Sequence, residues 1–199
     1  LAKDKKPLAR AELTTVVSDL LQMNLSIRES ELVADVLIEL VRQAEKELRE
    51  ALAERLSILD NVPLRLILKI ANDDIEIARP VLKNSPVLGD LDLIYIIKSK
   101  STEYWQAIAT RSTLSDQVIN ILADTRDIDT AIAMAENKNI KLSERAAVIL
   151  SDMAQDSETL AAPLLRREEI GNEIASKLYK FVGQELKKFI TQNYQIESS

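Results

Sequence analysis

A pattern that recurs about every 26 to 30 residues is the feature that most limits how this chain can fold. In each copy, a small or apolar residue is followed by a polar residue and then by Arg or Asn. The copies are Ala53 to Arg55, Leu82 to Asn84, Ala109 to Arg111, Ala135 to Asn137 and Leu165 to Arg167. A steady period of this length is typical of repeat proteins, in which each repeat is one small group of helices or strands.

A helix-capping residue lies at one fixed distance upstream of each of the last four copies. These residues are Asp74, Ser101, Asp127 and Ser157. Their side-chain oxygens can accept hydrogen bonds from the free amides of a first helical turn, so each predicts a helix start. The predicted helices span residues 75–84, 102–111, 128–137 and 158–167.

A second series of capping residues predicts the other helix of each pair. Asp90, Ser115, Ser143 and Asn172 each precede a stretch with apolar residues three or four positions apart, and Asn61 with Pro63 opens an earlier one. A pair of short helices cannot bury its apolar face alone, so the pairs are expected to stack. The sequence therefore predicts an all-α fold, an α-solenoid of HEAT-like helix pairs. Because the repeats share no strict consensus, an irregular helical bundle stays as the alternative.

Longer helices are predicted to cap both ends. Residues 28–59 contain no Gly, Pro or Asn and carry an apolar residue at every fourth position, from Leu32 to Leu52, which predicts one very long helix or two nearly collinear ones. We expect an N-terminal helix and linker over 1–27 and a repeat domain over 28–199. The repeat domain comprises the long segment 28–59, repeats over about 61–170 and a C-terminal cap helix over 172–194, all in one continuous domain. The start at Leu1 rather than Met suggests a piece of a longer protein.

Composition removes most catalytic chemistry. The 199 residues include no Cys and no His, so thiolate metal sites and histidine-based catalysis are excluded, and three Gly are too few for a phosphate-binding loop. We expect no enzyme activity, cofactor or metal. The net charge of −6 disfavours binding to nucleic acid. No apolar run is long enough for a membrane span or signal peptide, so a cytoplasmic location is expected.

Two groups of residues are candidates for binding a partner. Tyr95, Tyr104 and Trp105 would form a protein-binding hot spot if exposed, although the position of Trp105 favours the core. The repeated Arg or Asn positions, which include Arg111 and Arg167, could bind an acidic peptide, although capping of a helix C-terminus is the favoured interpretation. Lys83 and Arg166 complete the predicted protein-binding set, and with Lys138 this basic edge is also the candidate site for nucleic acid.

The C-terminal stretch gathers the other four aromatic residues, namely Tyr179, Phe181, Phe189 and Tyr194. A terminal repeat usually presents a polar outer side. An aromatic one therefore predicts self-association, and we expect a homodimer through this end.

The segment from Leu52 to Leu122 resembles a known family. The most specific text is Ile77 to Leu82, which reads IARPVL, and Ser85 to Leu88, which reads SPVL. These motifs are similar to those of the bacterial family named domain of unknown function 2336. The resemblance implies a HEAT-like helical domain in a bacterial, mostly alphaproteobacterial, cytoplasmic protein of unassigned function. It supplies no catalytic residues.

Taken together, these patterns favour a non-enzymatic scaffold or adaptor that binds a protein or peptide. Two alternatives from other classes stay open. The first is a helical repeat protein that binds nucleic acid through the basic edge, and the second is a domain that senses a small molecule in a pocket between helices.

Overall fold

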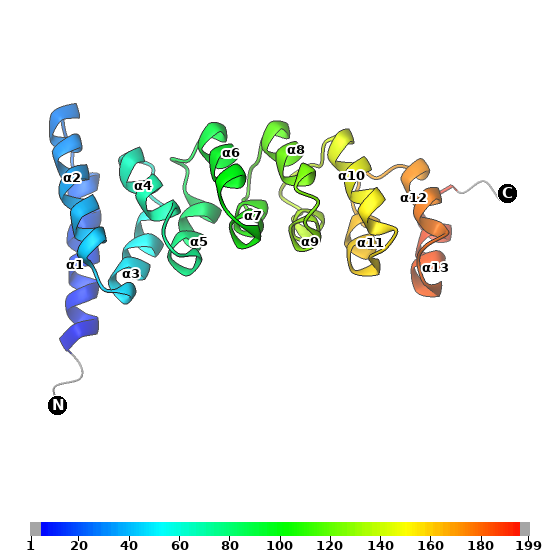
Figure 1. Cartoon of the computed structure of the whole chain (residues 1–199), viewed down its shortest axis with the longest axis horizontal. Helices are drawn as coiled ribbons and strands as arrows, with labels where there is room; N and C mark the ends of the chain where they lie inside the picture. Colours follow the sequence, from blue (N-terminus) through cyan, green and yellow to red (C-terminus); the bar gives the residue numbers. More distant parts are fainter. Residues whose placement is uncertain (1–4, 196–199) are drawn as a thin grey trace. The chain divides into compact units, whose positions relative to one another are not determined.

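The computed structural model describes residues 5–195, which form thirteen helices and no strand (Figure 1). The predicted all-α fold is confirmed. Internal contacts divide the chain into two compact units, residues 1–96 (unit 1) and residues 97–199 (unit 2). The division falls within a helix and does not coincide with the predicted boundary after residue 27. That the chain forms one continuous domain stays a prediction.

Unit 1 consists of two rows of packed helices. Its helices are α1 (Lys5–Gln22), α2 (Ile27–Gln43), α3 (Lys46–Leu56), α4 (Leu64–Ala71), α5 (Ile75–Asn84) and the larger part of α6 (Asp90–Ser99). In one row α1 packs on α3 and α3 on α5, and in the other α2 packs on α4. Contacts of α4 with α3 and α5 join the rows.

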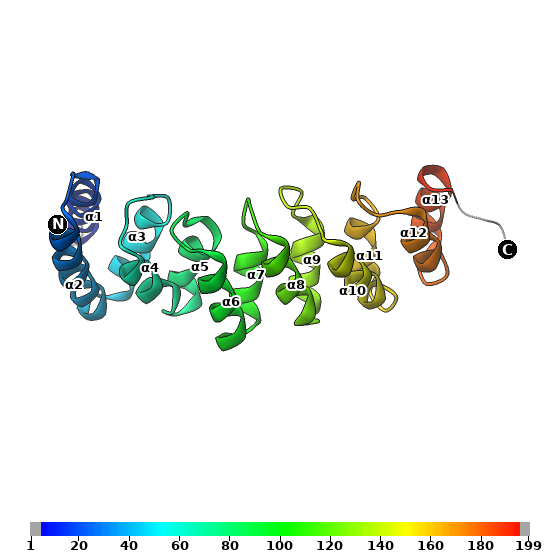
Figure 2. The same ribbon diagram turned by 90° about the horizontal axis from the view of Figure 1, so that it is seen from above.

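Unit 2 repeats this arrangement. Its helices are α7 (Thr102–Ala109), α8 (Asp116–Asp124), α9 (Ile128–Glu136), α10 (Glu144–Ala154), α11 (Glu158–Leu164), α12 (Asn172–Tyr179) and α13 (Gln184–Asn193). One row runs from α7 through α9 to α11, and the other from α8 through α10 to α12 (Figure 2). Contacts between successive helices join the rows, as expected for stacked helix pairs.

The capping pattern located six helix starts to the residue and three others within two residues. Asp90 and Asn172 are the first residues of α6 and α12 and not residues before them, and the N-cap of α4 is Pro63 and not Asn61. Asp74, Ser101, Asp127 and Ser157 are the N-cap residues of α5, α7, α9 and α11. In the other row, Ser115 and Ser143 are the N-caps of α8 and α10, and their hydroxyls accept from the amides of Val118 and Ala146. Asp74 and Ser101 occupy the N-cap position without a side-chain cap bond. At these two helices the residue type marked the boundary without making the expected hydrogen bond.

Both predicted end helices are broken in two. Helix α2 ends at Gln43, where Ala44 and Glu45 adopt extended conformations with ψ angles of 145° and 156°. The break lets α2 pack on α4 while α3 packs on α1 and α5. The predicted helix over 172–194 is likewise two helices, α12 and α13, which pack on each other. Gly183 is the N-cap of α13, and its amide donates to Glu158 Oε1 at 3.2 Å.

Candidate functional site

The C-terminal ends of several helices are capped by a side chain from farther along the chain. Asn137 Nδ2 donates to the carbonyl oxygens of Ala109 at 2.8 Å and Arg111 at 2.7 Å, at the end of α7. The Tyr194 hydroxyl donates to the carbonyl of Leu165, at the end of α11. The last carbonyls of a helix lack partners within it, so these bonds satisfy groups that would otherwise be unpaired.

Arg167 makes the most extensive of these contacts. The residue is 9% exposed. Its Nη1 donates to three carbonyl oxygens at 2.8–3.2 Å, Nη2 donates to a fourth, and the four belong to Met134, Ala135, Asn137 and Ile140. Together these groups form the end of α9 and the loop after it. The guanidinium of Arg167 therefore closes the C-terminus of the preceding helix in its row.

In unit 1, Asn61 plays the same part, because its Nδ2 donates to the carbonyl of Leu21 near the end of α1. We call Asn61, Asn137, Arg167 and Tyr194 the cross-repeat caps. Their bonds reach back between 26 and 40 residues. Of the Arg and Asn residues of the repeat, Asn137 and Arg167 cap a helix, and each caps the preceding helix of its row and not its own. Arg55 instead donates to the hydroxyl of Ser18.

Glu169 completes the site around Arg167. Its Oε1 accepts from Arg167 Nε at 2.8 Å and from the backbone amide of Leu142 at 2.8 Å. Burial opposes ionisation of Glu169, but the hydrogen bonds from the amides of Leu142 and Glu169 and from Arg167 outweigh it and hold its pKa below the ordinary 4.5. This carboxylate thereby fixes the loop after α9 to the loop after α11.

An open groove of about 1060 Å³ lies between these two loops. Its walls are residues 138–142, the first turn of α10, and residues 166–169. The apolar residues of its lining are Pro163, which is half-buried, and Ile140, Leu142 and Ala147, which are buried. A cleft of this volume is at the upper end of the range for binding sites, and here its two loops are fixed by Arg167 and Glu169.

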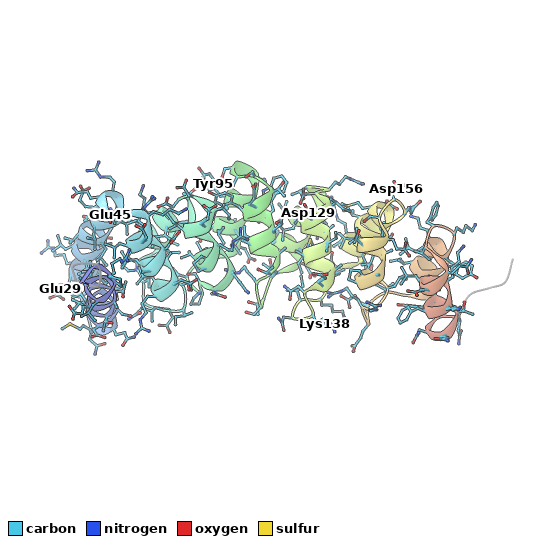
Figure 3. The ribbon with its side chains drawn as sticks, turned by 90° about the horizontal axis from the view of Figure 1, so that it is seen from below. Glu29, Glu45, Tyr95, Asp129, Lys138 and Asp156 are labelled. Carbon is cyan, nitrogen blue, oxygen red and sulfur yellow. The ribbon has the colours of Figure 1, made fainter. Side chains whose placement is uncertain are left out.

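Charges of both signs surround the groove. Lys138, Lys141 and Arg166 are exposed cations, and Glu136, Glu144 and Glu168 are exposed carboxylates. Within residues 7–195 neither lysine forms an ion pair, whereas the guanidinium of Arg166 lies 5.9 Å from the ring centre of Phe189. Lys138 lies at the edge of unit 2 opposite to Asp156 (Figure 3). The described side chains include no group of three or more acidic residues suited to a metal ion.

The structure separates the predicted basic residues by accessibility. Lys83 is exposed on α5 in unit 1. Arg166 is exposed beside the groove, whereas Arg111 and Arg167 are buried, at 7% and 9% exposure. The structure thus buries most of Arg111 and Arg167, and the Arg167 guanidinium donates to backbone carbonyls and to Glu169.

The predicted aromatic hot spot divides between the two units. Tyr95 lies in unit 1 on α6 and is 64% exposed. Tyr104 and Trp105 are half-buried on α7 in unit 2. Trp105 Nε1 donates to the carbonyl of Ile97 at 2.7 Å, and the Lys100 ammonium lies 5.1 Å from the Tyr104 ring centre. Trp105 thus serves the packing of unit 2, whereas Tyr95 presents its ring to solvent.

The C-terminal aromatics do not form one exposed patch. Phe181 is 53% exposed, but Phe189 lies under Arg166, and the Tyr179 ring lies 5.6 Å from the Lys187 ammonium. The Tyr194 hydroxyl is used as a cross-repeat cap. Burial raises the pKa of Tyr194 above its ordinary value. The homodimer through these residues stays a prediction.

Two features of the site were missed from sequence. Tyr194 follows Arg167 by one further period of the repeat, and extending the alignment by one copy could have found it. Lys141 and Glu144 border the groove through the loop after α9, and the repeat alignment carries no signal for a loop position.

No helix of the described residues is both long and apolar enough to cross a membrane.

Comparisons with known proteins give one match, to a family. Neither the curated proteins nor the solved structures yield a match. A family model described as an uncharacterised protein conserved in bacteria, domain of unknown function 2336, matches residues 77–199, from α5 to the last residue and not from Leu52. This match covers more than half of the length of the chain, so the chain belongs to that bacterial family.

Proposed function

We propose that this protein is a non-enzymatic scaffold that binds an extended segment of a partner protein in the groove of unit 2. The observation that carries the proposal is the groove itself, an open cleft of about 1060 Å³ between two loops that Arg167 and Glu169 fix together. A preformed site lowers the ordering cost of binding, because its loops do not have to be immobilised when the ligand arrives.

The charges of the groove favour a polypeptide over a nucleic acid. Three exposed cations and three exposed carboxylates border the groove, so a polyanion would meet as much repulsion as attraction. A peptide segment can offer both signs of charge and an apolar side chain for the half-buried Pro163. The groove also exceeds the usual volume of a small-molecule pocket, about 300–1000 Å³, and is open to solvent.

The test is selection of peptides from a random displayed library on the full chain, followed by mapping of amide chemical shifts by nuclear magnetic resonance. We expect selected peptides to shift the amides of residues 138–142 and 166–169. The variant Lys138→Glu/Lys141→Glu should weaken them about tenfold, a change of roughly 1.4 kcal/mol. The matched control is Lys98→Glu/Lys180→Glu, which makes the same charge change at exposed lysines outside the groove.

Selected peptides that shift amides elsewhere, or that bind both variants equally, would contradict the proposal. A labelled random single-stranded DNA serves as the competing ligand. Salt-dependent binding of that DNA, lost in Lys138→Glu/Lys141→Glu and retained in the control, would instead assign the groove to nucleic acid.

A further inference from the structure

A second cleft adjoins the groove of unit 2. It is open, has a volume of about 450 Å³, and lies between the end of α8 and the first half of α10. We call it the side cleft, and its lining residues are Asp124, Arg126, Glu144, Arg145, Val148 and Ile149. Glu144 also lines the groove, so the groove and the side cleft meet at the first turn of α10.

Arg126 enters the side cleft from an unfavourable backbone conformation. It follows Thr125, the C-cap of α8, and its φ angle of 51° is the one positive value among the described residues. Glycine is the common residue at this position of a helix end, because the left-handed conformation brings a Cβ atom too close to the backbone. An arginine here is therefore less favourable to folding than a glycine would be.

The turn between α8 and α9 is held by side chains other than that of Arg126. Thr125 Oγ1 donates to the carbonyl of Leu122 at 2.6 Å and accepts from the amide of Asp127 at 3.3 Å, and Asp127 in turn caps α9. The guanidinium of Arg126 is exposed and forms no hydrogen bond or ion pair with any group of residues 7–195. An unfavourable conformation at a residue whose side chain does not serve the fold points to a function for that side chain.

The free charges of the side cleft differ in sign between its two ends. Arg145 neutralises Asp124, because its Nη2 donates to both carboxylate oxygens at 2.7 and 2.9 Å. Among the described lining residues this leaves the cation of Arg126, at the end of α8, and the carboxylate of Glu144, at the boundary with the groove. A ligand that passes from the groove into the side cleft matches these charges with a basic group first and an acidic group after it.

Val148 adds apolar surface to the side cleft. It lies one turn after Glu144 on α10 and is 52% exposed. A polypeptide can offer basic, apolar and acidic side chains within a few residues. A nucleic acid would instead bring phosphates against Glu144, and a small inorganic anion would leave Val148 uncovered. The side cleft therefore suits the same class of ligand as the groove.

We propose that the partner segment bound in the groove continues over the first turn of α10 into the side cleft, where it places an apolar side chain on Val148 and a carboxylate against Arg126. This inference rests on the proposed function and names the chemistry of the partner, a segment with an acidic residue outside the part held by the groove. A guanidinium can bind a carboxylate through two parallel hydrogen bonds, so Arg126 fixes the position of the segment along its path.

The test uses peptides selected for the groove from the random library on the full chain. We expect them to shift the amides of residues 124–126 and 148 in addition to those of the groove, and to require one Asp or Glu for full affinity. Arg126→Gln should weaken them about fivefold, the effect of one exposed ion pair. The matched control is Arg79→Gln, which removes an exposed guanidinium outside both clefts and should leave the affinity unchanged.

A cycle of substitutions assigns the effect to the carboxylate. Replacing the required Asp or Glu of the peptide by its amide should weaken binding to the wild type about fivefold and should have little further effect on Arg126→Gln. Arg126→Gly gives a second readout of opposite sign. It should weaken the peptide like Arg126→Gln but raise the urea concentration at which unit 2 unfolds, because glycine adopts the left-handed conformation at lower cost. A general loss of structure cannot produce both changes.

Four results would overturn the proposal. Peptides that shift only groove amides and bind Arg126→Gln as tightly as wild type would remove the side cleft from the binding site and leave the proposed function standing. Equal weakening by Arg126→Gln and Arg79→Gln would mean that the peptides respond to net charge. Unfolding of Arg126→Gly at a lower urea concentration would show that Arg126 serves the fold. Failure to select any peptide for the groove would overturn both proposals together.

Discussion

The helix ends of unit 2 and the exposed apolar residues of α2 in unit 1 differ in what their side chains contact. In unit 2, Asn137, Arg167 and Tyr194 point to the repeat before them, and their polar groups donate hydrogen bonds to backbone carbonyls of that repeat. On α2, Leu32 and Val36 have the apolar character of a core stripe but contact solvent. Residues that recur with the period hold the repeats together, and the surface available to partners lies where the stacking leaves side chains uncovered.

The largest effect should come from Arg167→Ala. The substitution leaves four backbone carbonyls and the Glu169 carboxylate without their donor, so the free energy of unfolding of unit 2 should fall by about 3–5 kcal/mol. Urea unfolding followed by the fluorescence of Trp105, the single tryptophan, measures it. Arg166→Ala is the matched control, with an expected change within about 0.5 kcal/mol. Similar losses in both variants would contradict the structural role of Arg167.

Asn137→Ala should have the next largest effect. It removes two hydrogen bonds to the carbonyls of Ala109 and Arg111 and leaves them unsatisfied, at a cost of about 1–3 kcal/mol. The same urea measurement applies. Asn139→Ala removes an exposed amide two residues away and should leave unit 2 as stable as before, whereas an equal loss would show that the loop and not the cap matters.

Tyr194→Phe should lower the free energy of unfolding by about 0.5–1.5 kcal/mol, since it removes one hydroxyl donor and little volume. Because burial raises the pKa of Tyr194 in the folded state, its stabilisation is present below pH 10 and is lost as the pH rises through the folded pKa. The difference from wild type should therefore shrink above pH 10. Tyr179→Phe, whose hydroxyl has no hydrogen-bond partner among residues 7–195, should show no such difference.

The smallest effect is expected for Leu32→Ala on the exposed side of α2. Its side chain is 64% exposed, so the free energy of unfolding should stay within about 0.5 kcal/mol of wild type. Leu37→Ala, on the buried side of the same helix, should cost about 2–5 kcal/mol. Far-UV circular dichroism during urea unfolding compares them. A large loss for Leu32→Ala would show that this side of α2 is covered in the folded chain.

The helix starts were predictable from sequence because capping is local. An N-cap residue and the amides that it accepts from lie within one turn, so Ser115, Asp127, Ser143 and Ser157 carry their own signal. The break at Ala44 and Glu45 carries none, since neither residue disfavours a helix. It follows from the packing of α2 and α3 on different neighbours, which only the folded chain determines.

The site was less predictable for the same reason. The repeat placed Arg167 near a helix end, but its acceptors lie between 27 and 33 residues away and depend on how the pairs stack. The every-fourth apolar pattern from Leu32 to Leu52 also marked Leu32 and Val36 as apolar without showing that their side of α2 is uncovered. Periodicity identifies an apolar stripe, and tertiary packing decides whether anything covers it.

The backward direction of the cross-repeat caps has a consequence for synthesis on the ribosome. A chain is made from its N-terminus, and its domains fold in that order. Helix α9 therefore emerges with its last carbonyls open, and it completes its hydrogen bonding only after the ribosome has added Arg167. The caps of α9 and α11 each come from the helix pair that follows. Premature termination after α9, α10 or α11 therefore leaves a nascent chain in which the last helix of this row lacks its cap.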